Sequence, residues 1–186
     1  MLDISSNCYV KMGLILAAIV GLLITFFICT VRLFLVLRKD AEHKPGKKGA
    51  VSVLVVAGSG GHTTEILRLM ESLSRSYSPR HYVIADTDKM SEDKIRTLEN
   101  SHKEKDTTRQ VLCNGPGTCV PVCASALLLG ILGVKKVLII YVESICRVET
   151  LSLSGKLLYH LSDYFFVQWS ALKEKYPKST YLGRIV

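Results

Sequence analysis

The feature that most constrains the fold is a long apolar run near the N-terminus, which extends from Met12 to Val31 without a charged residue. A helix of roughly 20 such residues crosses the ~30 Å hydrocarbon layer of a bilayer. The apolar sequence continues beyond Arg32 to Leu37, and the long Arg32 side chain can reach the membrane interface. A cleaved signal peptide is the alternative, but its apolar region has only about 7–15 residues and ends in small residues. The sequence therefore predicts a transmembrane anchor over residues 12–37, with its core at residues 12–31.

The basic residues that flank this anchor predict its orientation. Only Lys11 precedes the apolar run, whereas five basic residues follow its end: Arg38, Lys39, Lys44, Lys47 and Lys48. Lys and Arg are enriched in the loops on the cytosolic side of a membrane. We therefore expect residues 1–11 to be lumenal, residues 38–49 to form a basic linker, and residues 50–186 to form a cytosolic domain.

Composition limits the remaining classes of protein. A chain of 186 residues has room for an anchor and one compact domain, but not for two full domains. Its net charge of +8 suits a membrane surface better than nucleic acid, because no basic stripe is interleaved with aromatic residues. None of the six cysteines forms a CxxC pair or neighbours a ligand-spaced histidine. We therefore predict no nucleic-acid partner and no metal site, and expect buried free thiols in a reducing compartment.

Beyond the linker, apolar strands alternate with helical patterns. The stretch 50–57 is β-branched and almost wholly apolar, which is typical of a strand in a parallel sheet that is covered on both faces. Further strands are expected at residues 81–85, 111–113, 137–142, 164–167 and 180–182. Helices are expected around residues 66–73 and at 90–98, 120–132, 151–161 and 170–176, the third of them apolar all round and buried. This alternation predicts an α/β domain with a Rossmann-like, doubly wound parallel sheet.

A glycine-rich turn follows the first strand directly and consists of Gly58, Ser59, Gly60, Gly61, His62 and Thr63. Glycines between a strand and a helix allow a ligand to approach the backbone closely, and the helix N-terminus offers unpaired N–H donors to an anion. The turn lacks the Lys-Ser/Thr of a Walker A loop, and Thr63 stands where the dinucleotide fingerprint has its third glycine. We predict a phosphate or pyrophosphate site here, with a purely structural turn as the alternative.

A second turn with the same layout contains Asn114, Gly115, Gly117 and Thr118, and Glu143 ends the strand at residues 137–142. Open parallel sheets bind ligands beyond the carboxyl ends of their strands, so we expect both turns and Glu143 to lie along one edge.

His62 is the first candidate for a general base, because the positive end of a helix dipole helps to keep its imidazole neutral. The alternative is a histidine that only hydrogen-bonds the neighbouring loop. Glu143 is the second candidate, and its alternative role is to cap the segment 144–149.

Five segments together resemble a known family: residues 55–69, 81–88, 114–133, 141–169 and 182–186. They are similar to the membrane-anchor subunits, the asparagine-linked glycosylation protein fourteen family, of the transferase that adds the second N-acetylglucosamine to dolichol-pyrophosphate-linked N-acetylglucosamine. More distantly, they resemble the N-terminal half of the bacterial transferase that glycosylates lipid-linked muramyl peptide. The resemblance covers nearly everything after Gly49.

This resemblance implies a GT-B transferase that is divided between two chains and needs no cofactor. The present chain would supply the membrane anchor at the endoplasmic reticulum and the acceptor-facing lobe, with the lipid pyrophosphate against the two glycine turns. A cytosolic subunit, asparagine-linked glycosylation protein thirteen, would hold UDP-N-acetylglucosamine, so neither chain would be active alone. The residues that would dock on that subunit are Leu182, Gly183, Arg184, Ile185 and Val186.

The chain departs from this family between Asp88 and the second turn. Family members have a further strand and helix there, whereas Gln110 here adjoins Val111 directly. The loss of such a unit removes a sheet neighbour, exposes apolar edges and leaves an entering strand of only residues 111–113. The chain is therefore identified as a shortened form.

Two other functions are compatible with parts of the sequence. The chain could be a scaffold that holds a catalytic partner at the membrane and does no chemistry. It could also be a membrane-bound, dinucleotide-dependent reductase with Asp86 as the ribose-binding acid, although the missing third glycine weighs against this.

Overall fold

The computed structural model describes residues 3–37, 51–74, 76–99 and 108–185, so the predicted basic linker at residues 38–49 lies outside the described residues. The chain divides into two compact units, Met1–Arg38 and Lys39–Val186. We describe each unit by itself.

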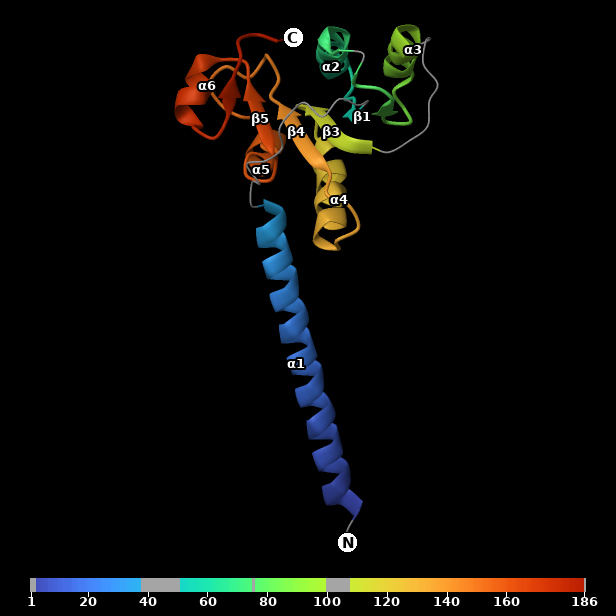
Figure 1. The fold of residues 1–186 in the computed structure, drawn as a ribbon, viewed down its shortest axis with the longest axis vertical. Helices are drawn as coiled ribbons and strands as arrows, with labels where there is room; N and C mark the ends of the chain where they lie inside the picture. Colours follow the sequence, from blue (N-terminus) through green and yellow to red (C-terminus); the bar gives the residue numbers. More distant parts are fainter. Residues whose placement is uncertain (1–2, 38–50, 75, 100–107, 186) are drawn as a thin grey trace. The chain divides into compact units, whose positions relative to one another are not determined.

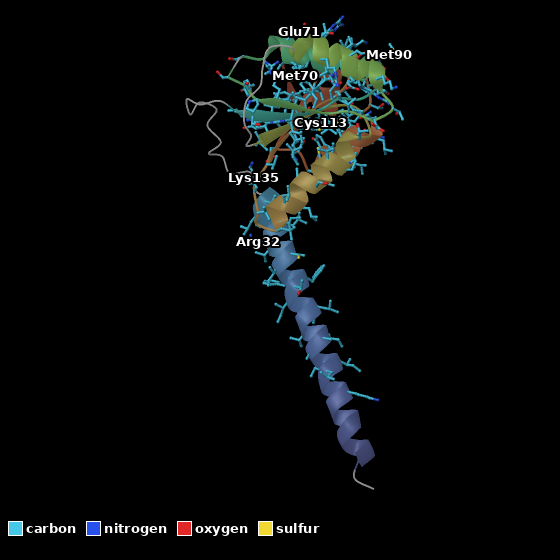
Figure 2. All side chains as sticks on the ribbon, turned by 90° about the vertical axis from the view of Figure 1, so that its right-hand side faces the viewer. Arg32, Met70, Glu71, Met90, Cys113 and Lys135 are labelled. Atoms are coloured by element: carbon cyan, nitrogen blue, oxygen red, sulfur yellow. The ribbon has the colours of Figure 1, made fainter. Side chains whose placement is uncertain are left out.

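The first unit is one long helix, α1 (Asp3–Leu37) (Figure 1). The most apolar 18-residue stretch within Lys11–Val36 has a mean hydropathy of 2.9, and none of that stretch is buried. Figure 2 shows the side chains of this segment projecting all round the helix. The prediction of an N-terminal helix long and apolar enough to cross a membrane is confirmed.

The second unit contains six parallel strands in the order β2-β1-β3-β4-β5-β6. These strands are β1 (Ser52–Val56), β2 (Arg80–Val83), β3 (Thr108–Asn114), β4 (Leu138–Val142), β5 (Tyr164–Val167) and β6 (Thr180–Tyr181). Buried β-branched residues such as Val53 and Val55 fill the inner strands. The prediction of an α/β fold with a parallel sheet is therefore confirmed.

Helices cover both faces of this sheet, as Figure 1 shows. On one face, α2 (Gly61–Ser72) and α3 (Lys89–Glu99) share a core cluster to which they contribute Ile66, Met70 and Ile95. The other face has its own cluster, which includes residues of α4 (Cys119–Ile131), α5 (Leu153–Leu158) and α6 (Ser170–Lys175). Helix α2 is amphipathic, because Met70 is buried whereas the neighbouring Glu71 is exposed (Figure 2).

The prediction for the strand before the second turn was wrong in length. Strand β3 begins at Thr108 rather than at Val111, because its polar start pairs with the strands on both sides. Thr108 pairs with Ser52 of β1, and Gln110 pairs with Leu138 of β4. Backbone pairing does not require apolar side chains, which is why hydropathy placed the start too late.

The prediction that residues 120–132 form a fully buried helix was also wrong in part. Only one side of α4, with Cys119, Cys123 and Ala126, packs into the core. Leu128 and Leu132 on the other side are 58% and 66% exposed. A helix that is apolar all round has no marked polar face, so its sequence could not reveal which side meets the sheet.

The cysteine prediction is correct only in part. The free thiols of Cys113, Cys119 and Cys123 are buried around α4, and the sulfur atoms of Cys113 and Cys123 lie 3.5 Å apart. The free thiols of Cys29 and Cys146 are exposed instead.

Candidate functional site

The two glycine turns touch each other at the carboxyl edge of the sheet. A Cβ added to Gly58 would lie 2.6 Å from the Cβ of Pro116, so these two residues of different turns are in close contact. A Cβ added to Gly115 would lie 2.7 Å from Cε1 of His62. Both positions therefore require glycine for packing, and the structure brings His62 and the second turn together.

The N-termini of α2 and α4 both lie at this edge. Gly60 and Gly115 have positive φ angles of 63° and 69°, a conformation that glycine adopts without steric cost. Neither α2 nor α4 has a side-chain cap or an acidic residue in its first turn. The first two N–H groups of α4, those of Cys119 and Val120, donate to the carbonyls of Pro116 and Gly117. The partly positive ends of both helix dipoles face this edge.

Only some of the predicted turn residues are exposed at the surface. Ser59, Gly60, Gly61, Gly117 and Thr118 are exposed, whereas Gly58, Thr63, Asn114 and Gly115 are buried. A Cβ at Gly61 or Gly117 would meet no atom within 4 Å, so space is open beside both turns. Thr63 does not face this space, because its hydroxyl donates to the Gly58 carbonyl and lies 2.7 Å from Ser91 Oγ.

Two buried polar side chains at this edge lack a hydrogen-bond partner in the described part of the chain. They are His62, through Nδ1, and Asn114, through both atoms of its amide. Unpaired buried polar atoms cost about 1–3 kcal/mol each, so a native structure normally satisfies them with protein, water or ligand. These two side chains thus mark the floor of the site.

Glu143, predicted as the second candidate base, is fully buried. Its carboxylate accepts hydrogen bonds of 3.1 Å from the Ser144 N–H, the Ser152 N–H and the Ser152 hydroxyl. Burial raises the pKa of this carboxyl, and the hydrogen bonds oppose that rise. A Cβ on Gly155 would collide with Oε2. The carboxylate has no side open to a ligand, so the geometry favours the alternative role of holding the chain after β4.

The loop after β4 and the start of α5 connect α2 with the second turn through hydrogen bonds that the sequence did not reveal. The Ser144 hydroxyl donates to Glu65 Oε1 in α2 over 2.8 Å, and the Ile145 N–H donates to Oε2 over 3.4 Å. Ser154 donates to the Gly115 carbonyl over 3.0 Å. Glu65 was not predicted as a site residue, because no local spacing signals a contact between distant segments.

The predicted docking segment begins on the surface after β6. Leu182 is 63% exposed, whereas Ile185 is half-buried and donates its N–H to Gln168 Oε1 over 3.2 Å. The guanidinium of Arg184 lies 4.2 Å from the centre of the Trp169 ring. Val186 lies outside the described residues.

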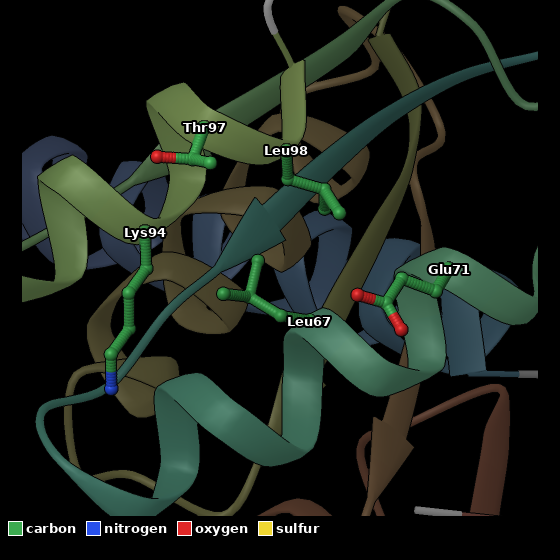
Figure 3. A pocket seen from close by; sticks show the side chains of 5 residues that line it. All are labelled: Leu67, Glu71, Lys94, Thr97 and Leu98. Atoms are coloured by element: carbon green, nitrogen blue, oxygen red, sulfur yellow. The ribbon is translucent and has the colours of Figure 1, made fainter.

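A separate pocket lies between α2 and α3, away from the glycine turns (Figure 3). Its lining consists of Leu67, Glu71, Lys94, Thr97 and Leu98. It contains none of the predicted site residues. Asp86, the acid of the reductase alternative, is exposed beyond the end of β2.

Comparison with known proteins agrees with this architecture. A family described as "Oligosaccharide biosynthesis protein Alg14 like" matches residues 53–111 and 101–185. The UDP-N-acetylglucosamine transferase subunit ALG14 of Homo sapiens is 53% identical over 217 positions, which cover 93% of this chain and 98% of that protein. The Schizosaccharomyces pombe subunit of the same name is 37% identical, over 78% of this chain and 87% of that protein. No solved structure gives a significant match.

The matches also locate the difference in length. The alignment with the human protein has 217 positions whereas this chain has 186 residues, so the relative has internal residues without a counterpart here. The two family matches meet at residues 101–111, between α3 and β3. This is where the sequence predicted a missing unit. With matches to both halves of its α/β unit, the chain belongs to the Alg14-like family of oligosaccharide biosynthesis proteins, as a shortened form.

Proposed function

We propose that this chain is the membrane-anchoring, acceptor-binding subunit of a two-subunit UDP-N-acetylglucosamine transferase of the GT-B type. The complex would add the second N-acetylglucosamine to dolichol-pyrophosphate-N-acetylglucosamine at the endoplasmic reticulum membrane. The names of the relatives support a transferase subunit. The step, the lipid acceptor and the membrane are our inference.

The contact between the two glycine turns is the observation that carries this proposal. It sets the N-termini of α2 and α4, neither of which has a side-chain cap, side by side, with His62 against Gly115. A pyrophosphate carries adjacent negative charges, and paired helix ends offer it N–H donors and a favourable dipole. A turn with a purely structural role would not require two helix N-termini without side-chain caps at the same edge of the sheet.

The chemistry follows from the positions of the turns. A lipid pyrophosphate held at Gly61 and Gly117 would present its sugar close to His62. The imidazole would then accept the proton from the sugar hydroxyl as that oxygen attacks the anomeric carbon of the donor and UDP leaves. His62 is the base that we propose, and Glu143 holds the loop behind it.

The proposal needs a second subunit to hold the nucleotide sugar. Leu182 to Val186 would dock on it, and the exposed side chains of Leu182 and Arg184 leave that segment accessible. The basic residues after α1 support a cytosolic location for the domain and this partner. We therefore infer that the chain recruits a cytosolic donor-binding subunit, asparagine-linked glycosylation protein thirteen, to the membrane.

Substitution of His62 tests this function. We expect His62→Ala to lower the turnover of the purified two-subunit complex by about 10²–10⁴-fold, because the general base is lost. His160→Ala is the matched control, since His160 lies beyond α5 at the opposite edge of the sheet and should leave turnover unchanged. Transfer to a lipid-linked acceptor is measured per folded complex, with membrane level and partner binding checked in parallel. Normal turnover in His62→Ala would leave the scaffold as the better explanation.

A further inference from the structure

We propose that Gln168 and Trp169 are positioning residues that connect the docking segment to the acceptor turns, so that binding of the donor subunit raises the affinity for the lipid acceptor. This inference rests on the proposed function of the two turns and of residues 182–186. It assigns a role to a pair of side chains that do not themselves touch a substrate.

The first link joins the docking segment to the end of β5. Gln168 is 1% exposed, and its Oε1 accepts the N–H of Ile185 over 3.2 Å. Arg184 lies over the neighbouring Trp169 ring at 4.2 Å, a distance suited to a cation–π contact. Two consecutive residues of the docking segment are therefore held by two consecutive residues after β5.

The second link joins the same side chains to the loop after β4. The other end of the Gln168 amide donates through Nε2 to the carbonyl of Glu143 over 3.0 Å. The indole N–H of Trp169 donates to the carbonyl of Ile145 over 2.7 Å. Each side chain thus contacts the docking segment on one side and residues 143–145 on the other.

The third link runs from this loop to both glycine turns. Ser144 and Ile145 donate to the two carboxylate oxygens of Glu65 in α2, which lies three residues after His62. The Glu143 carboxylate accepts a hydrogen bond from the N–H of Ser152, the N-cap of α5. Ser154 of the same helix donates to the Gly115 carbonyl. A shift of residues 143–145 would therefore move both turns.

The burial of Gln168 makes these links interdependent. A buried amide is stable only when both its donor and its acceptor are paired, so loss of the Ile185 contact leaves Oε1 unsatisfied. A subunit that fixes residues 182–186 favours the arrangement in which the amide is paired at both ends. By thermodynamic linkage, an acceptor that fixes the turns must strengthen partner binding by the same factor.

The experiment measures this reciprocity in the full chain with its donor-binding partner. A short-chain lipid pyrophosphate-N-acetylglucosamine serves as the acceptor probe, and partner affinity is measured with and without it. In the unaltered protein we expect the acceptor to tighten partner binding by about tenfold, within the usual range of allosteric coupling. Gln168→Met removes both amide bonds at nearly constant volume and should abolish this gain. With saturating partner, its KM for the acceptor should rise about tenfold while its KM for UDP-N-acetylglucosamine stays unchanged.

Two further variants protect the test against a simple loss of stability. Trp169→Phe keeps the ring beneath Arg184 but removes the hydrogen bond to Ile145, so it should reduce the coupling even if Gln168→Met fails to fold. Val167→Ala is the control, because Val167 is buried in the cluster on the opposite face and has no part in the links, so its coupling should be normal.

The outcomes separate the inference from the function on which it rests. Full coupling in both Gln168→Met and Trp169→Phe, or no coupling in the unaltered complex, would overturn the inference while leaving the transferase intact. Failure of the unaltered complex to use or bind the acceptor would overturn the proposed function itself.

Discussion

Adjacent glycines in the first turn are required for different physical reasons. Gly60 has a φ of 63°, where any side chain is strained even though no neighbour lies within 4 Å of its Cβ position. Gly61 has no such angle, and its Cβ position is equally open. Backbone conformation therefore explains Gly60, whereas neither the backbone angle nor a described neighbour requires glycine at position 61, and we attribute Gly61 to the ligand that we propose.

This difference predicts opposite results for valine at the two positions. Gly60→Val should lower the free energy of unfolding by roughly 1–3 kcal/mol, the cost of a side chain in the sparsely populated backbone region with a φ of 63° and a ψ of −119°. Gly61→Val should fold normally but raise the KM for the lipid acceptor at least about tenfold, because its side chain enters the space in which we place the pyrophosphate. Denaturant unfolding and steady-state kinetics distinguish them, with the donor KM as the internal control. An unchanged acceptor KM in Gly61→Val would remove the first turn from the site.

The buried Glu143 predicts a specific pH dependence of stability. Burial raises the pKa of its carboxyl above the ordinary value of 4.5, so the folded state holds this proton more tightly than the unfolded state. Such a group stabilises the fold below its unfolded pKa, and this contribution is lost as the pH rises through the folded pKa. Between pH 4.5 and neutrality, the unaltered chain should lose more stability than Glu143→Gln, which cannot titrate. Chemical unfolding across this range measures the two slopes, and equal slopes would contradict the assignment.

At the scale of the elements, local pattern predicted most of the fold. The β5 strand at residues 164–167 was predicted to the residue, because a short apolar run with aromatic residues is bounded by polar ones. The start of β3 was missed because the pairing of Thr108 with Ser52 depends on a distant strand. The exposed side of α4 was missed for a related reason, since only the position of the sheet decides which side is buried.

The candidate site, like the fold, was predictable from the sequence only in part. Its glycine turns were predictable because strand, glycines and helix are consecutive in the sequence. The bonds from Ser144 to Glu65 and from Gln168 to Glu143 join residues 79 and 25 positions apart, and no local motif encodes them. The burial of Glu143 likewise depends on Gly155 and Ser152, which arrive with the next helix.

The anchor helix gives a prediction of its own at this scale. The basic residues after α1 predict that its C-terminal end faces the cytosol. An Asn-Xaa-Thr glycosylation acceptor in an extension before Met1 should therefore be modified in cells, and one inserted between Lys44 and Lys48 should not. Gel mobility before and after glycosidase treatment reads out both. The reverse pattern would place the domain away from the cytosol and would contradict the proposed access to a nucleotide sugar.

At the scale of the whole α/β unit, the strand order shows where the shortened segment belongs. The usual dinucleotide-binding order is 3-2-1-4-5-6, and this sheet has the order β2-β1-β3-β4-β5-β6. Its strands β1 to β5 follow the usual order without the outermost strand beside β2, and β6 is added at the far end. The lost unit was expected to remove a sheet neighbour, and among the described residues β2 lacks one on its outer side. β1 keeps a partner on each side, and β2 becomes the edge.

The position of α3 indicates that the absence of a strand beside β2 is unfavourable for the fold. The connections from β1 to β2 and from β2 to β3 run in opposite directions across the sheet, yet α2 and α3 pack on the same face. A crossover from β2 to β3 that passes through α3 on this face has the opposite hand to the one from β1 to β2, although about 98% of such crossovers are right-handed. With a further strand beside β2, α3 would connect β2 to that strand, in the same direction across the sheet as α2 connects β1 to β2. Both connections would then have the favoured hand.

Restoring the internal segment of the human relative between α3 and β3 should therefore stabilise the fold. The added strand would pair with β2, so the backbone amides of Arg80–Val83 should exchange with deuterium more slowly. A gain of about 1 kcal/mol would raise the melting temperature by about 2–4 °C in a domain of this size. Hydrogen exchange and thermal unfolding of both chains in the same detergent measure these effects, with the amides of β4 as an internal reference because that strand already has two neighbours. If β2 is protected equally without the segment, β2 is not the edge at which the segment pairs. The left-handed connection would then be a stable feature of this chain, because the packing of Ile95 against Ile66 and Met70 is sufficient to hold α3 in place.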